Sequence, residues 1–158
     1  MKNEKIKINS GITIIEIVIG ITLFVIIAGI TIVSFNPAGQ FAKARNSERE
    51  MHLTAIMIVV KQNIAESVNG SFNCASGPIP VSSTKMASAS GSYNIAPCLI
   101  PNYISALPFD PKSTGAHYAG ISDYDTGYFI AQTSSTTSTA ITISAPSAEL
   151  GQTISISR

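Results

Sequence analysis

The sequence predicts an α+β protein in which a long N-terminal helix packs, through its second half, on a small antiparallel sheet. Residues 12–33 form an apolar run long enough to cross a bilayer as a helix. Apolar residues then recur every three or four positions from Leu53 to Val68, the period of an amphipathic helix. Residues 140–144 and 153–157 alternate apolar and polar side chains, as half-buried strands do. The chain length of 158 residues predicts one folded domain beyond the apolar run.

Residues 1–11 form a short basic segment in front of the apolar run. Its three lysines outnumber its single glutamate, so the positive-inside bias keeps this end in the cytoplasm. We interpret residues 1–11 as a leader peptide and residues 12–35 as a transmembrane helix. A secretory signal peptide would have a shorter apolar core, with its small-residue cleavage site after that core. A plain single-span anchor remains the alternative.

Glu16 is the one charged residue within the apolar run. A carboxylate in hydrocarbon costs roughly 2.5–3.5 kcal/mol on insertion scales, so such a residue usually has a partner. The run holds no Lys, Arg or His that could supply one. The partner is therefore expected on another chain, or as a charge made by processing. A cut after Gly11 would place a new α-amino group on Ile12 and make Glu16 the fifth residue of the mature chain.

The sequence GITIIE followed by an apolar helix resembles the class III signal peptide of type IV pilins and type II secretion pseudopilins. In that family a prepilin peptidase cuts after the glycine and methylates the new N-terminus. The resemblance assigns Gly11 to the residue before the cut, Ile12 to the methylated position and Glu16 to the fifth mature residue. Ile12 departs from the Phe that is usual there. Residues 35–56 also resemble pilin-like proteins, and the likeness is loose beyond residue 70.

The resemblance implies a pilin-like fold and a structural role. Such a subunit is stored in the cytoplasmic membrane, as a single-pass protein with an extracytoplasmic head, and is then extracted into a helical filament of copies of itself. An inner-membrane assembly platform and a cytoplasmic assembly ATPase are the implied partners, besides the peptidase. A pilus, a DNA-uptake pilus and a secretion pseudopilus all share this N-terminus, and a membrane-tethered binding module that does not polymerise is the alternative function.

Residues 36–70 are expected to continue as an amphipathic helix that packs on the head. Asn36-Pro37 should interrupt the helix, because proline lacks a backbone donor and clashes with the preceding turn. Asn69-Gly70 should end it, since both residues tolerate a left-handed cap. The apolar stripe comprises Leu53, Ile56, Val60, Ile64 and Val68. The wetter face is predicted to comprise Arg45, Glu48, Arg49, Glu50, Lys61 and Glu66.

Residues 71–158 form the predicted head. Residues 71–115 are loop-rich, with one or two short strands or turns expected. Strands are predicted at Tyr128–Thr133, Ala140–Ser144 and Thr153–Ser157, and a weaker candidate lies at His117–Ile121. Their apolar faces should close on the helix stripe.

Cys74 and Cys98 are the only two cysteines of the chain. Outside the cytoplasm an even pair predicts a disulfide, and the loop it closes would stabilise the head by about 3 kcal/mol in the chain-entropy model. Two free buried thiols are the alternative. Two cysteines without a nearby His or a CxxC spacing cannot complete a zinc site.

Asp110 lies in the sequence Leu107-Pro108-Phe109-Asp110-Pro111, which resembles the turn before the sheet of major pseudopilins. In those proteins a downstream loop binds calcium, and the resemblance makes Asp110, Asp123 and Asp125 candidate ligands. Calcium takes six to eight oxygen ligands. The alternative is that Asp110 caps a turn, while Asp123 and Asp125 lie on a solvated hairpin loop.

Catalysis and nucleic-acid binding find no support in the sequence. The two histidines, His52 and His117, belong to no motif of known chemistry, and His52 is expected at the helix surface beside Glu48. Once residues 1–11 are removed, seven basic and eight acidic residues remain, so no basic patch favours phosphate binding. The sequence therefore predicts that the protein is not an enzyme.

Overall fold

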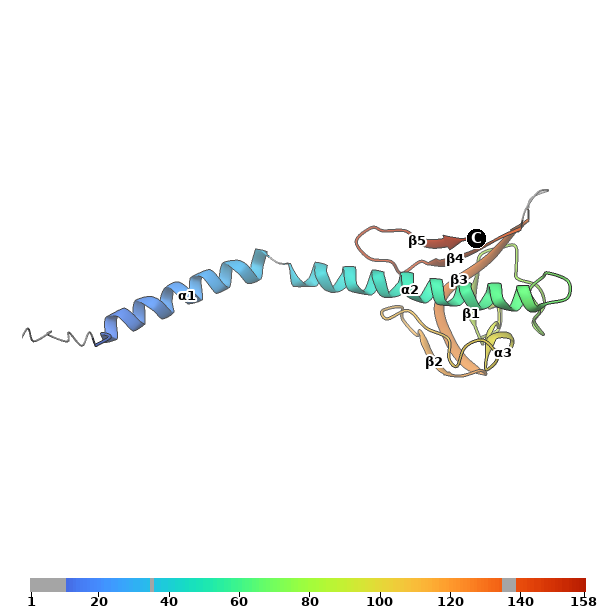
Figure 1. Cartoon of the computed structure of the whole chain (residues 1–158), viewed down its shortest axis with the longest axis horizontal. Helices are drawn as coiled ribbons and strands as arrows, with labels where there is room; N and C mark the ends of the chain where they lie inside the picture. Colours follow the sequence, from blue (N-terminus) through green and yellow to red (C-terminus); the bar gives the residue numbers. More distant parts are fainter. Residues whose placement is uncertain (1–10, 35, 135–138) are drawn as a thin grey trace, which may run out of the picture. The chain divides into compact units, whose positions relative to one another are not determined.

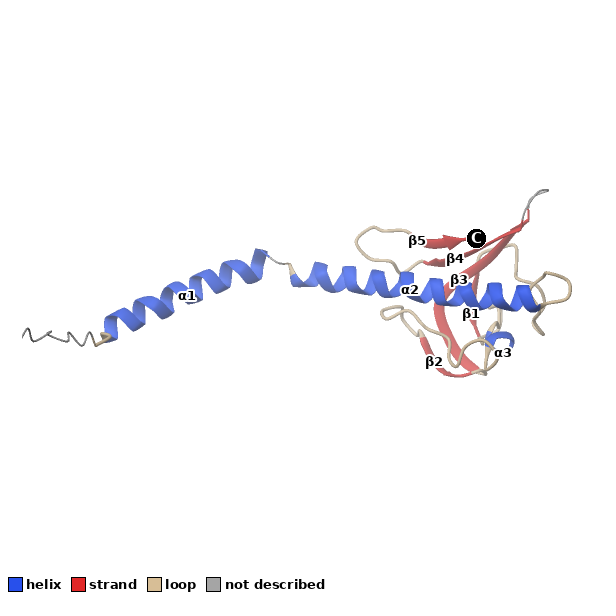
Figure 2. Ribbon diagram, viewed as in Figure 1, coloured by secondary structure: helices blue, strands red, loops and turns tan. Residues whose placement is uncertain are grey.

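The structure is a computed structural model that describes residues 11–34, 36–134 and 139–158 (Figure 1). It is an α+β protein that divides into two compact units, Met1–Gln40 and Phe41–Arg158. The first unit contains helix α1 (Ile14–Ser34) and the start of helix α2 (Pro37–Glu66). The second unit contains the rest of α2 and the sheet (Figure 2).

Helix α1 is strongly apolar apart from Glu16 in its first turn, and its apolar side chains are exposed. Within it, Ile14–Ile32 has a mean hydropathy of 2.6, and none of this stretch is buried. The helix is therefore long and apolar enough to cross a membrane. It begins at Ile14, two residues later than the sequence predicted, because Thr13 occupies the N-cap.

Asn36 separates the two helices and begins the second. Its backbone is left-handed, with φ of 41°. Its side-chain Oδ1 accepts a hydrogen bond from the Gly39 amide at 3.2 Å, and its carbonyl accepts one from Gln40. Pro37 follows as the first helical residue, where a missing N–H costs nothing. The predicted interruption at Asn36-Pro37 is thus confirmed, and it is an N-cap.

The sheet of the second unit is antiparallel throughout. Its strand order is β1-β3-β4-β5, and β2 pairs with β3. The strands are β1 (Thr84–Ala87), β2 (His117–Gly120), β3 (Asp123–Ser134), β4 (Thr139–Ala145) and β5 (Ile154–Ser157). Each of the four predicted strands has a counterpart, although β3 begins five residues earlier than expected. The loop-rich region 71–115 adds β1 and a one-turn helix, α3 (Ala96–Leu99).

The core lies between α2 and one face of the sheet (Figure 2). From the predicted stripe, Leu53, Ile56 and Val60 are fully buried, and Ile64 packs at the edge of the core. They meet buried side chains of the strands, which include Tyr128, Ile130, Ile141 and Ile143. By burial of roughly 1.5–3 kcal/mol for each large apolar side chain, this contact is the main stabilisation of the second unit.

Two helix predictions were wrong. Val68 is fully exposed, because α2 ends at Glu66, two residues before Val68 and short of the predicted end at Asn69-Gly70. Arg49, assigned to the wetter face, is fully buried. Arg49 precedes Leu53 by one turn, so it lies on the same face as the apolar stripe, and its charge is compensated inside the protein.

Candidate functional site

The residues that the sequence singled out for processing and assembly lie just before α1 and in its first turn. Gly11 and Ile12 precede the helix and are exposed, and Glu16 lies in its first turn. A Cβ added to Gly11 would meet no atom within 4 Å. The fold therefore gives no reason for a glycine at position 11.

Thr13 caps the N-terminus of α1 by accepting a hydrogen bond from the Glu16 amide, and the sequence analysis missed this cap. The Glu16 amide donates to Thr13 Oγ1 at 3.3 Å, and the Ile17 amide donates to the Thr13 carbonyl. Thr13 to Glu16 has the T-x-x-E spacing of a capping box, and this spacing was the signal that could have revealed the cap. A carboxylate in the first turn also interacts favourably with the helix dipole. The cap uses the backbone amide of Glu16, so it does not require a particular side chain at this position.

Asp110 lies in a buried ion pair with Arg49. Arg49 Nε donates to Asp110 Oδ2 at 2.8 Å and Nη2 donates to Oδ1 at 3.0 Å, and both side chains are fully buried. Asp110 Oδ1 also accepts from the backbone amides of Lys112 and Ser113 at 2.8 and 2.9 Å. The hydrogen bonds from Arg49 and these amides outweigh burial and hold the pKa of Asp110 below its usual value. The alternative role as a turn cap is therefore seen, together with a partner that the sequence analysis did not identify.

Glu149 extends this ion pair into a network. It accepts two hydrogen bonds from Arg45, at 2.6 and 2.8 Å, and one each from Lys112 Nζ at 2.6 Å and Arg49 Nη1 at 3.2 Å. The hydrogen bonds from Arg45 and Lys112 lower the pKa of Glu149 strongly. Asn46 bonds to both the amide and the carbonyl of Glu149. The network ties the β4–β5 loop and the turn at Asp110 to the middle of α2.

Asp123 and Asp125 have partners of their own at the start of β3. Asp123 pairs with His117, whose Nε2 lies 3.0 Å from Oδ1, and Asp125 pairs with Lys85. Asp125 Oδ1 also accepts from the Gly127 amide at 2.8 Å. The Gly115 carbonyl and Asp123 raise the pKa of His117. The two aspartates thus lie in β3 rather than on a hairpin loop.

The turn at Asp110 contacts the segment that holds Asp123 and Asp125. The contact is made by backbone atoms and not by the carboxylates. The Asp110 amide donates to the Thr126 carbonyl at 2.9 Å. Gly127 has φ of 72°, and a Cβ there would lie 3.0 Å from Asp110 Cβ, so only glycine fits against this turn. Within residues 11–34, 36–134 and 139–158, no group of three or more His, Cys, Asp or Glu could hold a metal ion. The arrangement does not fit a shared calcium shell, and calcium binding stays a prediction.

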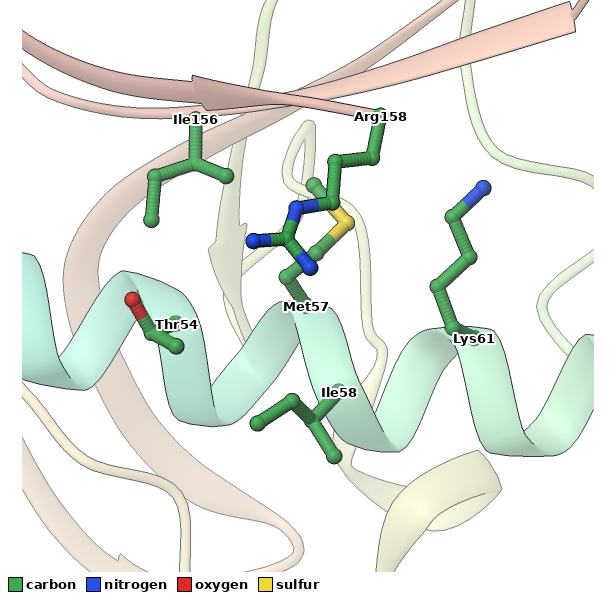
Figure 3. Close-up of a pocket in the computed structure, with 6 residues that line it drawn as sticks. All are labelled: Thr54, Met57, Ile58, Lys61, Ile156 and Arg158. Carbon is green, nitrogen blue, oxygen red and sulfur yellow. The ribbon is translucent and has the colours of Figure 1, made fainter.

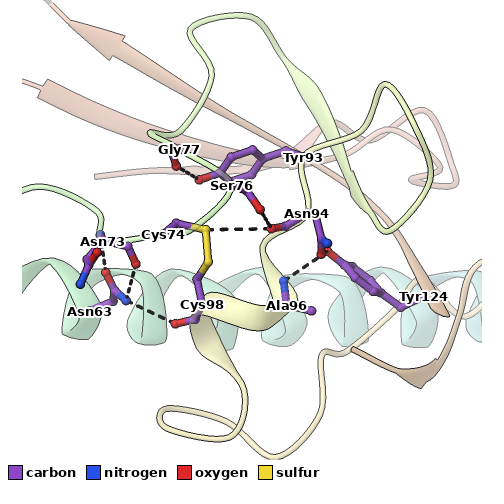
Figure 4. The surroundings of a disulfide bond; sticks show 10 residues. All are labelled: Asn63, Asn73, Cys74, Ser76, Gly77, Tyr93, Asn94, Ala96, Cys98 and Tyr124. Atoms are coloured by element: carbon purple, nitrogen blue, oxygen red, sulfur yellow. Dashed lines mark hydrogen bonds between the residues drawn. A yellow bond between two sulfur atoms is a disulfide. The ribbon is translucent and has the colours of Figure 1, made fainter. Parts of the chain in front are cut away.

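Cys74 and Cys98 are joined by a disulfide with a sequence separation of 24 (Figure 4). Asn63 of α2 bonds to both sides of the bridge. Its Nδ2 donates to the carbonyls of Asn73 and Cys98 at 3.2 and 3.3 Å, and its Oδ1 accepts from the Asn73 amide at 2.8 Å. The disulfide and Asn63 together hold the loop-rich region against the end of α2.

The two histidines take part in structural contacts. His52 Nδ1 lies 2.9 Å from the Tyr128 hydroxyl, and its Nε2 lies 3.8 Å from Glu48, the neighbour expected from the sequence. His117 contacts the Gly115 carbonyl and Asp123. These contacts give both side chains a role in packing, and the absence of catalysis stays a prediction.

Comparison with known proteins gives no match to a family model, a curated protein or a solved structure.

Proposed function

We propose that this chain is a structural subunit of a type IV pilus-like or type II secretion pseudopilus filament. The observation that carries the proposal is an uncovered apolar helix with a single carboxylate, Glu16, in its first turn. A helix with this surface needs lipid or other apolar helices around it. A filament core built from copies of α1 would supply them after the subunit leaves the membrane.

Processing would create the cation that Glu16 lacks. In the part of the chain that the structure describes, Glu16 forms no ion pair. A prepilin peptidase that cuts after Gly11 would leave an ammonium group on Ile12, methylated as the family resemblance implies. Neighbouring subunits would pair this ammonium with Glu16 and so set their axial register. A repeated contact of this kind is heterologous, and therefore propagates as a filament.

The remaining partners follow from the same resemblance. The subunit would wait in the cytoplasmic membrane with its second unit outside the cytoplasm. An assembly platform and a cytoplasmic ATPase would extract it. A disulfide in the second unit agrees with an oxidising compartment. The product would be a cell-surface or periplasm-spanning filament.

The experiment that tests processing replaces Gly11 with valine and measures the intact mass of the purified protein. The wild type is expected to lack residues 1–11 and to carry one extra methyl group. Gly11→Val should keep its full length, because the peptidase needs the smallest side chain before the cut. The fold itself tolerates the change, since position 11 is open.

Gly29→Val is the matched control, because a Cβ at Gly29 also meets no atom within 4 Å. It should be cleaved like the wild type. An uncut wild-type chain would favour the membrane-tethered binding module instead. Normal cleavage of Gly11→Val would exclude the proposed site.

A further inference from the structure

Strand β5 leaves one edge of the sheet unpaired. Among the described residues it pairs only with β4, and it is the last strand in the order. Ile141 and Arg158 exchange both backbone hydrogen bonds, at 2.8 and 3.0 Å. Hydrogen-bonded and non-bonded pairs alternate along an antiparallel ladder. The amides and carbonyls of Ser155 and Ser157 therefore point away from β4 and are free for another strand.

The inner face of this strand borders an apolar hollow against α2 (Figure 3). The hollow has a volume of about 180 Å³ and is lined by Thr54, Met57, Ile58, Lys61, Ile156 and Arg158. Figure 3 shows Ile156 and the Arg158 guanidinium reaching from the strand toward the helix. A cavity of about 150 Å³ accommodates benzene, so this hollow has room for one aliphatic side chain.

Two cations, Lys61 and Arg158, line the hollow. Among the described residues, neither Lys61 nor Arg158 forms a salt bridge. At its other side, Thr54 and Ile58 also line a shallower hollow that includes Glu50. The groove along α2 is thus basic at Lys61 and acidic at Glu50, and Figure 3 shows the Arg158 guanidinium over Met57, between Ile156 and Lys61.

We propose that the β5 edge and this groove bind an extended segment of a partner protein, in which an aliphatic residue lies two positions from an Asp or Glu. The segment would add a strand beside β5 through the free groups of Ser155 and Ser157. Side chains two positions apart share one face of a strand. The aliphatic residue would fill the hollow while the carboxylate reaches Lys61 and Arg158. Backbone bonds supply affinity in this mode, and the pocket supplies specificity.

The β4–β5 ladder suits such an addition. Its register is unbroken from Thr142↔Ser157 to Ala145↔Ile154, whereas the β1–β3 and β2–β3 pairs both contain register shifts. Bulges and prolines are common devices that prevent edge pairing, and β5 has neither. This inference does not depend on the proposed filament function.

The test uses the full chain in detergent micelles and a blocked peptide, acetyl-Thr-Leu-Thr-Asp-Thr-Tyr-amide. Binding is measured by titration calorimetry, and hydrogen exchange is followed at the Ser155 and Ser157 amides. The peptide is expected to slow exchange at both amides. A second peptide, with its aspartate moved next to leucine, places the carboxylate on the opposite face and should bind roughly two- to fivefold more weakly.

Protein variants test the backbone pairing at β5 and the carboxylate contact at Lys61 separately. Ser155→Pro removes an outward amide and leaves the bonds to β4 in place, so the dissociation constant should rise about fivefold. Ser155→Ala keeps that amide and should bind like the wild type. Lys61→Gln lies on the helix and should weaken binding roughly two- to fivefold for the aspartate peptide, with no effect on a leucine peptide that lacks the acid.

Three results would overturn the proposal. One is the absence of any exchange protection by the peptide. Another is equal binding by Ser155→Pro and Ser155→Ala. The third is protection of Ser155 and Ser157 that needs no peptide and grows with protein concentration, which would assign the edge to a second copy of this chain.

Discussion

Arg49 and Asp110 place opposite charges inside the second unit, where neither side chain contacts water. Burying two charges costs several kcal/mol each, and their mutual attraction with good hydrogen bonding offsets this cost. Here every buried polar side-chain atom among the described residues has a hydrogen-bond partner. The intact pair therefore adds little to the free energy of unfolding. Removal of one partner lowers that free energy much more, because the other charge stays buried.

Removal of one partner should destabilise the protein far more than removal of both. Asp110→Asn removes the bidentate counter-charge of Arg49 and leaves it only the 3.2 Å contact with Glu149, and should lower the free energy of unfolding by about 3–5 kcal/mol. Arg49→Met combined with Asp110→Asn removes both charges and keeps an Oδ1 acceptor for the Lys112 and Ser113 amides, and should recover most of that loss. Urea unfolding of the full chain in micelles measures each value. Equal losses for the single and double variants would contradict the argument.

Acid should weaken the same network. The folded state lowers the pKa of Asp110 and of Glu149, so it binds fewer protons than the unfolded state near their pKa values. Stability is therefore full above the ordinary carboxyl pKa of about 4 and falls as the pH drops below it. Urea unfolding at a series of pH values should show this fall in the wild type, and a shallower one in Asp110→Asn. A wild-type free energy that is flat below pH 4 would contradict this account.

At the scale of elements, the sequence predicted the helices and strands whose positions depend on neighbouring residues. Alternation located β4 and β5, and the Asn-Pro dipeptide located the start of α2, because these signals are carried by neighbouring residues. Arg49 was misplaced because its burial depends on Asp110, which lies 61 positions away. Glu149 escaped notice for the same reason, since its partners lie on α2 and in the turn after Asp110. The cap at Thr13 was visible in the T-x-x-E spacing and was missed.

The disulfide should stabilise the loop-rich region 71–115, whose only regular elements are β1 and α3. Cys74→Ser or Cys98→Ser should each lower the free energy of unfolding by about 3 kcal/mol, because the unfolded chain loses a cross-link across a separation of 24 residues. Denaturant unfolding without reductant measures this. Ser76→Ala is the control, since it removes one 2.7 Å hydrogen bond to the Asn94 carbonyl and leaves the bridge intact.

Thiol labelling completes this test. Unfolded wild-type protein that has never met reductant should take up no alkylating reagent, and reduced protein should take up two equivalents. Labelling of both cysteines in the untreated protein would show that the pair is free and that its stabilising role is absent.

At the scale of the whole molecule, the two units differ in the exposure of their apolar residues. The second unit buries its apolar residues between α2 and the sheet, whereas α1 leaves its own exposed. The exposed stretch Ile14–Ile32 of α1 therefore needs lipid or other apolar helices around it. Glu16 is the one point in α1 where those surroundings must supply more than apolar contact, and its local cap with Thr13 does not require a charge.

The charge of Glu16 can be separated from the helix cap by substitution. Glu16→Gln keeps the N-cap, since the Thr13 hydroxyl accepts from the backbone amide of residue 16, and it eases insertion by removing a charge. The variant should be inserted and cleaved normally, and should then fail in filament growth because the neighbouring Ile12 ammonium loses its partner in an apolar core. Leaving one buried charge unpaired costs about 3–5 kcal/mol. Filaments are counted by electron microscopy, and cleavage is followed by intact mass.

Thr13→Ala is the matched control because it removes the cap and keeps the carboxylate. Loss of an N-cap costs about 1 kcal/mol of helix stability, so this variant should still form filaments. If both variants polymerise normally, the Glu16 charge does not drive assembly. If Thr13→Ala fails and Glu16→Gln succeeds, the role of the first turn is to start the helix, and register between subunits must be set by another contact.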